Sequence, residues 1–433
     1  MGLVESFSGV RGVFGEDVDL SLCRKYATAL TELLGPGRIV VGRDTRPSGQ
    51  DILQALLPCL HEPIVVGVAS TPAIQEAVRA TGAIGGIIIT ASHNEPEYNG
   101  LKLLRADGAL LAKEDMERVI ARTRTVSEKT LRNKTTYYDA LAAYEKHVRS
   151  IIGDVQFTNA AVLIDPNGGA ACDYEKLLAS YGVEVSAVNN TPGVFTRRIE
   201  PNAQSLAPLQ SRITTQDFAA GFDCDADRVE LALPDRLVSG NEVLALALTE
   251  RLPTLPKGQT VVVNDATSQL VHAVAHEHGA RVVESGVGEI NVVDTMLCTG
   301  SVLGGEGSSS GAIVFPSRCR DGLLSVLLVL RYLSRTQQTL AQAVSRLPQF
   351  VSVRKNVTLA DVTSAREKLA AWGKERGADV RVSDAIKIVF ADRFAWMRAS
   401  QTETGVVRVI CDAPTKKEAE ALLSEVCGII GAE

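Results

Sequence analysis

The sequence predicts three similar α/β domains with mixed, largely parallel sheets, followed by a C-terminal α+β domain with an antiparallel sheet. A strand–helix–strand unit occurs three times, at intervals of roughly 100 residues. Its strands are continuous β-branched runs, which are typical of strands buried on both faces of a parallel sheet. The last part of the chain, about 85 residues, instead shows short strands joined by tight turns, as antiparallel sheets do.

Each repeated unit has the same order of elements: a β-branched run ending in Asp, a helix of about three turns, and a second apolar strand introduced by Gly or Pro. The predicted strand, helix and strand lie at 38–44, 50–59 and 63–68, at 161–166, 174–181 and 182–188, and at 260–265, 268–278 and 279–285. Alternating strands and helices imply right-handed crossovers within each unit.

The C-terminal region has a different pattern. Strands are predicted at 351–357, 387–391, 395–400 and 405–413, with helices at 362–376 and 415–426. Two helices flanking short strands favour an α+β module. We therefore expect four domains, at 1–150, 151–240, 241–348 and 349–433.

Composition excludes several classes of protein. The 433 residues carry 45 Lys and Arg against 51 Asp and Glu, and this net charge of −6 disfavours a nucleic-acid partner. No apolar run reaches the ~20 residues of a membrane helix, since the best candidate, Leu323–Leu333, contains Arg331. We therefore expect no membrane partner. The eight cysteines show no CxxC spacing, so we expect buried thiols in a reducing cytoplasm.

The first chemical motif follows a predicted buried strand, Ile87–Thr90, which places Ser92 and His93 on a loop at the carboxyl end of the strand. Ligand sites in open α/β sheets lie at such ends. A serine is a weak nucleophile unless a base or a metal assists it, and His93 and Lys102 are nearby candidates. By itself, a Ser-His pair in a loop is also typical of a structural turn or a helix cap.

The second motif is GFDCDADRVE, in which Asp223, Asp225 and Asp227 alternate and Arg228 follows. Carboxylates with this spacing can converge on a hard cation. An EF-hand is excluded, because its sixth and twelfth positions would be Arg228 and Pro234. A solvated acidic turn is the alternative, but three unscreened carboxylates beside a buried strand would repel one another, which favours a metal.

Two further loops carry polar side chains. The Gly/Ser-rich loop around Glu306 suits recognition of a polyol, although alone it is more typical of a flexible turn. A later turn between strands gathers Arg398, Ser400, Thr402 and Arg408. Hydroxyls and guanidinium groups of this kind form a phosphate-binding cradle, with a polar hairpin as the alternative.

Together these segments resemble the α-D-phosphohexomutase family, which interconverts sugar 6-phosphates and 1-phosphates. The segments resemble, in the family's order, its phosphoserine, metal, sugar-binding and phosphate-binding loops: TASHN at 90–94, DCDADR at 223–228, GGEGS at 304–308 and RASQTET at 398–404. Flanking matches are SGVRG at 8–12, GRDTRPSG at 42–49 and VASTP at 68–72. The resemblance spans essentially the whole chain.

The resemblance implies a phosphoserine mechanism. Ser92 is expected to carry a phosphoryl group and to pass it to the free hydroxyl of a hexose phosphate. The resulting hexose 1,6-bisphosphate, which also acts as an activator, then returns its other phosphate. The residues implied in this chemistry are Ser92, Asp223, Asp225 and Asp227 as ligands of Mg²⁺, Lys102 and His93 in proton transfer, and Arg11 and Arg228 at the transferring phosphoryl group.

The resemblance also implies how a small-molecule hexose phosphate is held. Its phosphate is expected to bind Arg398, Ser400, Thr402 and Arg408, and its hydroxyls Glu306 and Ser308. The four domains are expected to surround a central cleft, with the last one mobile, because the intermediate must bind in two poses. The enzyme could act as a monomer or a homo-oligomer.

Loop details bear on the preferred sugar. Ser309 and Ser310 stand where the family usually has Gly and then His or Gly, and Gln401 and Thr404 replace the common Gly and Pro of the phosphate loop. The sugar loop followed by CRDG at 319–322 looks most like archaeal phosphoglucosamine mutase and phosphomannomutase types. We expect glucosamine phosphate first, then mannose or glucose phosphate, with phosphopentomutase activity as a distant alternative.

Two other classes of function compete with an isomerase of carbohydrate metabolism. A metal-dependent sugar phosphatase could use Ser92 and the aspartates, but a hydrolase needs no second phosphate site. A non-catalytic sugar-phosphate-binding protein would have lost the nucleophile or a metal aspartate, and neither is lost. We therefore expect an active mutase.

Overall fold

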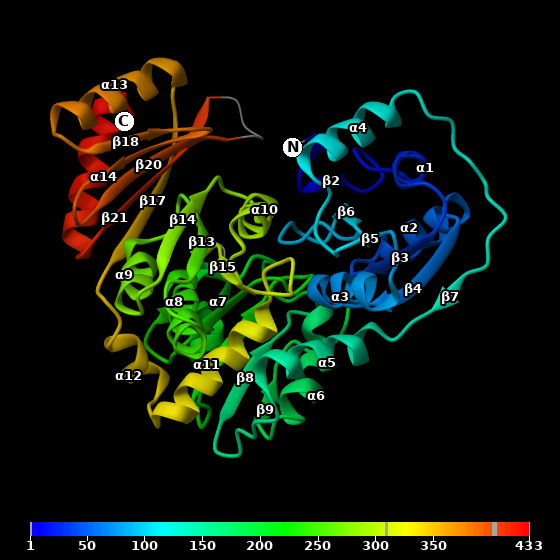
Figure 1. Ribbon diagram of the computed structural model, residues 1–433, viewed down its shortest axis with the longest axis horizontal. Helices are drawn as coiled ribbons and strands as arrows, with labels where there is room; N and C mark the ends of the chain where they lie inside the picture. The colour runs from blue at the N-terminus through cyan, green and yellow to red at the C-terminus, as the bar shows by residue number, and fades with distance from the viewer. Residues whose placement is uncertain (1, 308–310, 401–404, 433) are drawn as a thin grey trace.

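The computed structural model describes residues 2–307, 311–400 and 405–432. It contains four sheets of seven, five, four and five strands. Figure 1 shows them following one another in an arc, with the blue N-terminal sheet at one end and the orange-red C-terminal sheet at the other. Helices pack against all four sheets, and this arrangement confirms the predicted fold class.

The first sheet has the order β1-β2-β6-β5-β3-β4-β7. Its strands are β1 (Val4–Ser6), β2 (Gly9–Val13), β3 (Arg38–Arg43), β4 (Glu62–Val68), β5 (Gly85–Ile89), β6 (Tyr98–Arg105) and β7 (Thr136–Tyr137). Strands β5, β3, β4 and β7 are parallel, whereas β1, β2 and β6 add an antiparallel half. The helices are α1 (Leu20–Leu34), α2 (Gly49–Leu56), α3 (Thr71–Thr81), α4 (Lys113–Thr123) and α5 (Ala140–Ile152), with a 3₁₀ turn η1 (Leu57–Cys59).

The second sheet comprises β8 (Ala161–Asp165), β9 (Glu184–Ala187), β10 (Phe218–Phe222), β11 (Val229–Ala232) and β12 (Leu237–Val238). Strands β9, β8 and β10 are parallel, and β11 and β12 continue the sheet antiparallel. Its helices are η2 (Ala170–Asp173), α6 (Tyr174–Ala179) and α7 (Ala203–Gln210). The helix α6 ends at Ala179, before the predicted end at residue 181, and the chain turns at Gly182, whose φ is 76°.

The third sheet has β13 (Thr260–Asn264) parallel to β14 (Arg281–Ser285) and β15 (Leu303–Gly305), with β16 (Ala312–Val314) antiparallel at the edge. Its helices are α8 (Gly240–Arg251), η3 (Leu252–Thr254), α9 (Gln269–Glu277), α10 (Glu289–Thr299), α11 (Gly322–Thr336) and α12 (Leu340–Ser345). Every residue of β13 is buried, as its unbroken Val run predicts.

The C-terminal sheet is antiparallel throughout, in the order β17-β21-β20-β19-β18. Its strands are β17 (Val351–Thr358), β18 (Asp379–Val382), β19 (Ala385–Val389), β20 (Phe394–Ala399) and β21 (Val406–Ala413), and α13 (Val362–Glu375) and α14 (Lys416–Ile430) cover one face. Sequence patterning does not predict β18, because this edge strand is short, charged and largely exposed.

One hydrophobic core joins the first three sheets. Val78 of α3, Tyr144 of α5, Val162 of β8 and Leu327 of α11 belong to the same buried cluster. The C-terminal sheet has its own core against α13 and α14. A core shared by the first three sheets does not mark where one domain ends and the next begins. The domain limits at 150, 240 and 348 therefore stay a prediction.

Two expectations about the surface have different outcomes. Within the described residues, no helix combines the length and apolar character needed to span a bilayer. All eight cysteines are free, but Cys298 is exposed and Cys172 is half-buried, so the expectation of eight buried thiols is wrong at these two positions. Cys298 lies near the end of α10, whose last residues face solvent.

A buried histidine fastens the first sheet to the third. His147 on α5 is 7% exposed, and its Nε2 lies 2.8 Å from Ser317 Oγ in the turn after β16. Its Nδ1 lies 3.6 Å from Glu76 Oε2 on α3. Burial lowers the pKa of His147 to about 4, and the charge of Arg79 acts in the same direction.

We expect this histidine to make the fold sensitive to acid. The folded protein binds fewer protons than the unfolded chain between about pH 4 and 6.5, so stability falls as the pH is lowered through that window. His147→Gln removes the titration but keeps a hydrogen-bonding group. In urea unfolding, the wild type should lose about 2–3 kcal/mol more than this variant between pH 7.5 and 4.5.

The exposed His276→Gln serves as the matched control and should retain the wild-type loss. Equal pH dependence in the wild type and His147→Gln would show that the histidine does not carry the effect.

Candidate active site

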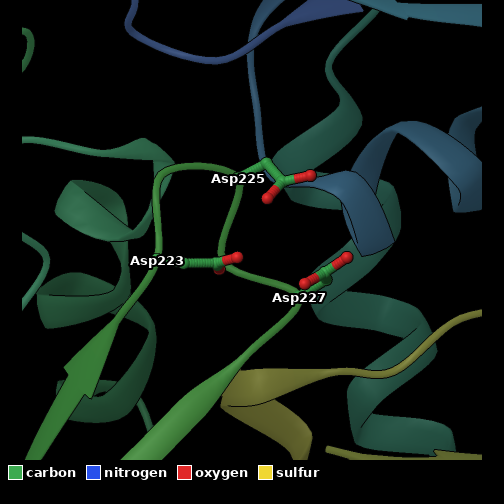
Figure 2. Close-up of side chains that lie close together, drawn as sticks. All are labelled: Asp223, Asp225 and Asp227. Atoms are coloured by element: carbon green, nitrogen blue, oxygen red, sulfur yellow. The ribbon is translucent and has the colours of Figure 1, made fainter. Parts of the chain in front are cut away.

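Three aspartates follow β10 and precede β11 in one tight loop. Carboxylate oxygens of Asp223, Asp225 and Asp227 lie within 4.8 Å of one another, and each side chain is at most 1% exposed. Figure 2 shows the three carboxylates, carried by one loop, gathered around a common space. The loop achieves this convergence by placing Ala226 in the left-handed region, with a φ of 58°.

The chemistry of these carboxylates fits a hard divalent cation. Asp225 Oδ1 and Asp227 Oδ1 are buried and have no hydrogen-bond partner among the described residues. Burial and the two neighbouring carboxylates raise the pKa of Asp223 well above its ordinary value. Buried, partnerless carboxylate oxygens are the ligands that Mg²⁺ prefers. This region can therefore hold Mg²⁺.

Ser92 lies beside the aspartates, as the sequence motifs implied. Its Oγ donates a hydrogen bond of 3.3 Å to Asp223 Oδ2, across 131 residues of sequence. The serine has a φ of 51°, a left-handed conformation that is unfavourable for a residue with a Cβ. Its N–H donates to Thr90 Oγ1 at 2.8 Å, and Thr90 Oγ1 in turn donates to Asp44 Oδ2 at 2.7 Å.

Arg46 fixes the loop that carries Ser92, and sequence reasoning assigned it no role. Its guanidinium, in a side chain that is 1% exposed, donates to four backbone carbonyls and to Asp44. The acceptors are Ser92 O at 2.7 Å, Asn94 O at 2.6 Å, Glu95 O at 2.5 Å, Tyr98 O at 3.0 Å and Asp44 Oδ2 at 3.1 Å. The GRDTRPSG match was the available signal, but a motif does not show which carbonyls its arginine reaches.

Lys102 on β6 contacts two of the aspartates. Its Nζ lies 2.6 Å from Asp225 Oδ2 and 3.1 Å from Asp227 Oδ2. Burial lowers the pKa of Lys102, but the two carboxylates outweigh it and hold that pKa above its ordinary value. The amine is therefore a cation in this state. Thr71 completes the group, because its Oγ1 donates to Asp225 Oδ2 at 2.7 Å.

A cluster of cations surrounds His93. The nearby charge of Arg228, burial, and the charge of Arg11 lower the pKa of His93 well below its ordinary value. The imidazole is therefore neutral at pH 7. Arg228 Nε itself lies 3.8 Å from both Asp223 Oδ2 and Asp227 Oδ1.

The sugar-loop carboxylate Glu306 is tied to the metal loop through Arg320. Glu306 Oε2 lies 3.0 Å from Arg320 Nη1, while its Oε1 accepts from Asn264 Nδ2 at 2.8 Å and from the Gly288 N–H at 2.9 Å. Arg320 also pairs with Asp227 and with Glu289. Burial raises the pKa of Glu289 to about 7. Ser308, Ser309 and Ser310 lie outside the described residues.

The predicted phosphate-binding arginines lie opposite each other on neighbouring strands, Arg398 on β20 and Arg408 on β21. Burial and then the charge of Arg354 lower the pKa of Arg408. Arg354 on β17 is a neighbouring cation that sequence reasoning missed, because nothing local marks it. Ser400 follows β20, whereas Thr402, with Gln401 and Thr404, lies outside the described residues.

Comparisons with known proteins identify the family. Models of phosphoglucomutase/phosphomannomutase α/β/α domains I and III match residues 5–130 and 239–350. A phosphoglucomutase/phosphomannomutase of Thermococcus kodakarensis is 31% identical over 450 residues, covering 98% of this chain and 97% of that protein. The chain belongs to the α-D-phosphohexomutase family.

Other relatives of this phosphohexomutase agree. A phosphoglucosamine mutase of Thermotoga maritima is 27% identical over 443 residues, covering 98% of this chain and 97% of that protein. A phosphoglucomutase/phosphomannomutase family protein from Burkholderia thailandensis has the same fold, with a TM-score of 0.84, 24% identity and coverage of 100% and 99%. The protein is therefore an isomerase that transfers a phosphoryl group within a hexose phosphate.

We expect the Arg46 contacts to be needed for catalysis. Arg46→Lys leaves most of the four carbonyls without their donor, so the Ser92 loop should relax away from Asp223. Misplacement of a reacting group by about 1 Å can lower kcat about 10²-fold. Steady-state kinetics should show this loss, whereas the exposed Arg38→Lys on β3 should leave kcat unchanged. A wild-type kcat in Arg46→Lys would contradict the assignment.

Mg²⁺ should stabilise the folded protein through the aspartates. A ligand present at 100 times its Kd adds about 2.7 kcal/mol to the free energy of unfolding, which a thermal-shift titration detects. Asp225→Asn should abolish the shift, because it removes a ligand charge. The exposed Asp235→Asn should retain it. An unchanged shift in Asp225→Asn would place the metal elsewhere.

Proposed function

We propose that this phosphohexomutase interconverts glucosamine 6-phosphate and glucosamine 1-phosphate. The observation that supports this sugar is the convergence of two buried carboxyl groups near the sugar loop. Glu289 and Glu306 share the single guanidinium of Arg320, which also contacts Asp227. A sugar with a cationic amino group complements such a site better than an uncharged hexose does. The similarity to the Thermotoga maritima phosphoglucosamine mutase points the same way.

A second candidate is the mannose or glucose phosphate pair. The 31% identical relative from Thermococcus kodakarensis is named a phosphoglucomutase/phosphomannomutase and matches over nearly its whole length. These alternatives share one chemistry and differ only at carbon 2, in the group that the sugar carries there or in its configuration.

In the proposed mechanism, Ser92 carries the phosphoryl group. Asp223, Asp225, Asp227 and a phosphoserine oxygen would hold Mg²⁺, which supplies positive charge against the charge that develops during transfer. Arg11 and Arg228 stabilise the oxygens of the transferring group. The bond from phosphorus to Ser92 Oγ breaks as the bond to the sugar hydroxyl forms.

Proton transfer accompanies this exchange. His93, neutral at pH 7, accepts the hydroxyl proton, and protonated Lys102 can supply one to the Ser92 oxygen as that oxygen leaves. The product of the first half-reaction is a hexose 1,6-bisphosphate. Its other phosphate returns to Ser92 after the intermediate reorients.

The remaining residues hold the substrate. Arg398, Ser400 and Arg408, together with Thr402 outside the described residues, bind the phosphate that is not being transferred. Glu306 and Ser308 bind sugar hydroxyls. Because this phosphate site is separate from Ser92, the arrangement favours a mutase over a phosphatase.

A substrate panel tests the proposal. With Mg²⁺ and a hexose 1,6-bisphosphate present, we expect kcat/KM for glucosamine 6-phosphate to exceed that for mannose, glucose and ribose phosphates by about 10-fold or more. Ser92→Ala should lose nearly all turnover and the phosphoryl mass, about 80 Da, on its peptide. The exposed Ser211→Ala is the control.

A higher kcat/KM for mannose or glucose phosphate would replace the proposed sugar but leave the mutase in place. Phosphate release equal to substrate loss would instead indicate a hydrolase.

A further inference from the structure

Arg320 occupies an unusual position between three carboxylates from three parts of the chain. It lies between β16 and α11 and is 6% exposed. Its Nη2 lies 3.4 Å from Asp227 Oδ2, its Nη1 3.0 Å from Glu306 Oε2, and its Nε 3.3 Å from Glu289 Oε2. One rigid guanidinium therefore touches the metal loop, the sugar loop and the start of α10.

The surroundings leave Arg320 little freedom. The Glu289 carboxylate also accepts a bond of 3.1 Å from the backbone N–H of Arg320. A Cβ on Gly311 would stand 2.6 Å from Arg320 Cβ, so the glycine lets the sugar-loop backbone pass close to the arginine stem. Glu306 is held from its other side by Asn264 and Gly288. The contacts thus fix both ends of the bridge.

We propose that Arg320 is a positioning residue that couples Mg²⁺ binding at the aspartates to sugar binding at Glu306. The inference rests on the roles proposed above for Asp227 and Glu306. A ligand that shifts either carboxylate also shifts the guanidinium held against it, and the rigid guanidinium passes this shift to the other carboxylate, so the second ligand meets a carboxylate that is already placed for it. Coupling of this kind is reciprocal, so the sugar phosphate strengthens metal binding by the same factor as the metal strengthens sugar binding.

The bridge between the three carboxylates depends on the planar guanidinium of Arg320. A lysine keeps the charge but presents a single point, so it cannot hold carboxylates in three directions at once. Arg320→Lys therefore tests the geometry without leaving buried carboxylates uncompensated. A merely structural ion pair would change stability in this variant but would leave the coupling factor between the two ligands unchanged.

The experiment measures Mn²⁺ affinity by electron paramagnetic resonance, without and with saturating glucosamine 6-phosphate or, separately, mannose 6-phosphate. Full-length, dephosphorylated protein with Ser92 intact is used and no bisphosphate is added, so that no phosphoryl transfer occurs. We expect the sugar phosphate to lower the Kd for Mn²⁺ by about 5-fold or more. With Arg320→Lys added, this ratio should fall to within about 2-fold of unity.

Arg318→Lys is the matched control. Arg318 lies two residues away, pairs with Asp107 and stacks on Phe315, outside the carboxylate cluster. It should retain the full ratio. Because the ratio is taken within one variant, a general loss of stability or of charge does not imitate the result.

The outcomes separate the proposals. Equal ratios in Arg320→Lys and the control would overturn the coupling, even with both ligands bound. A protein that binds no Mn²⁺ would overturn the metal site, and one that binds Mn²⁺ but neither sugar phosphate would overturn the proposed substrates. Either of these two results would also overturn the proposed coupling.

Discussion

Repulsion among three buried carboxylates is the physical constraint on which the rest of this structure depends. Asp223, Asp225 and Asp227 lie together where water cannot screen them, and like charges in such surroundings repel strongly. Cations from separate elements lie against them: Lys102 from the first sheet, Arg228 from the loop itself and Arg320 from the approach to α11. The core shared by the first three sheets is what keeps these cations in register with the loop.

The loops at the site hold conformations that their sequences alone would not favour. Ser92 and Ala226 both adopt positive φ, which costs roughly 1–2 kcal/mol for each residue. Such conformations persist only where the surroundings hold them. Arg46 holds the Ser92 loop through its carbonyls, and the Thr71 N–H holds the metal loop by donating to Asp225 O at 2.8 Å. The proposed nucleophile is therefore held in place by the protein's own contacts, which is the condition for electrostatic preorganisation.

Site residues could be predicted from the sequence where they lie close together in the chain, but not where their roles depend on tertiary contacts. The alternation of three aspartates predicted a converging triad, because side-chain spacing within one loop fixes which groups can meet. The role of Arg320 could not be predicted, since 93 residues separate it from Asp227 in the chain. Arg46 stood in a recognised motif, yet only the folded loop shows the carbonyls it binds. The strand β18 was missed because edge strands need no hydrophobic alternation, and its side chains are largely exposed.

The C-terminal sheet is attached differently from the others. Its joint to the third sheet combines a small apolar cluster, in which Ala266 packs with Phe394, Trp396 and Ile410, with polar contacts. Glu284 accepts from Lys387 Nζ at 2.5 Å and from Arg381 Nη1 at 2.7 Å, and Asp412 accepts from the Gln269 N–H at 3.0 Å. Joints between domains allow relative motion unless they are large and hydrophobic. An enzyme that presents either end of its substrate to one serine needs a fixed phosphoryl donor and an adjustable anchor for the other phosphate. The core shared by the first three sheets lies under Ser92 and the aspartates, and the separate core of the C-terminal sheet lies under Arg398 and Arg408. The proposed phosphoryl donor and the proposed phosphate anchor therefore stand on different cores, as the proposed mechanism requires.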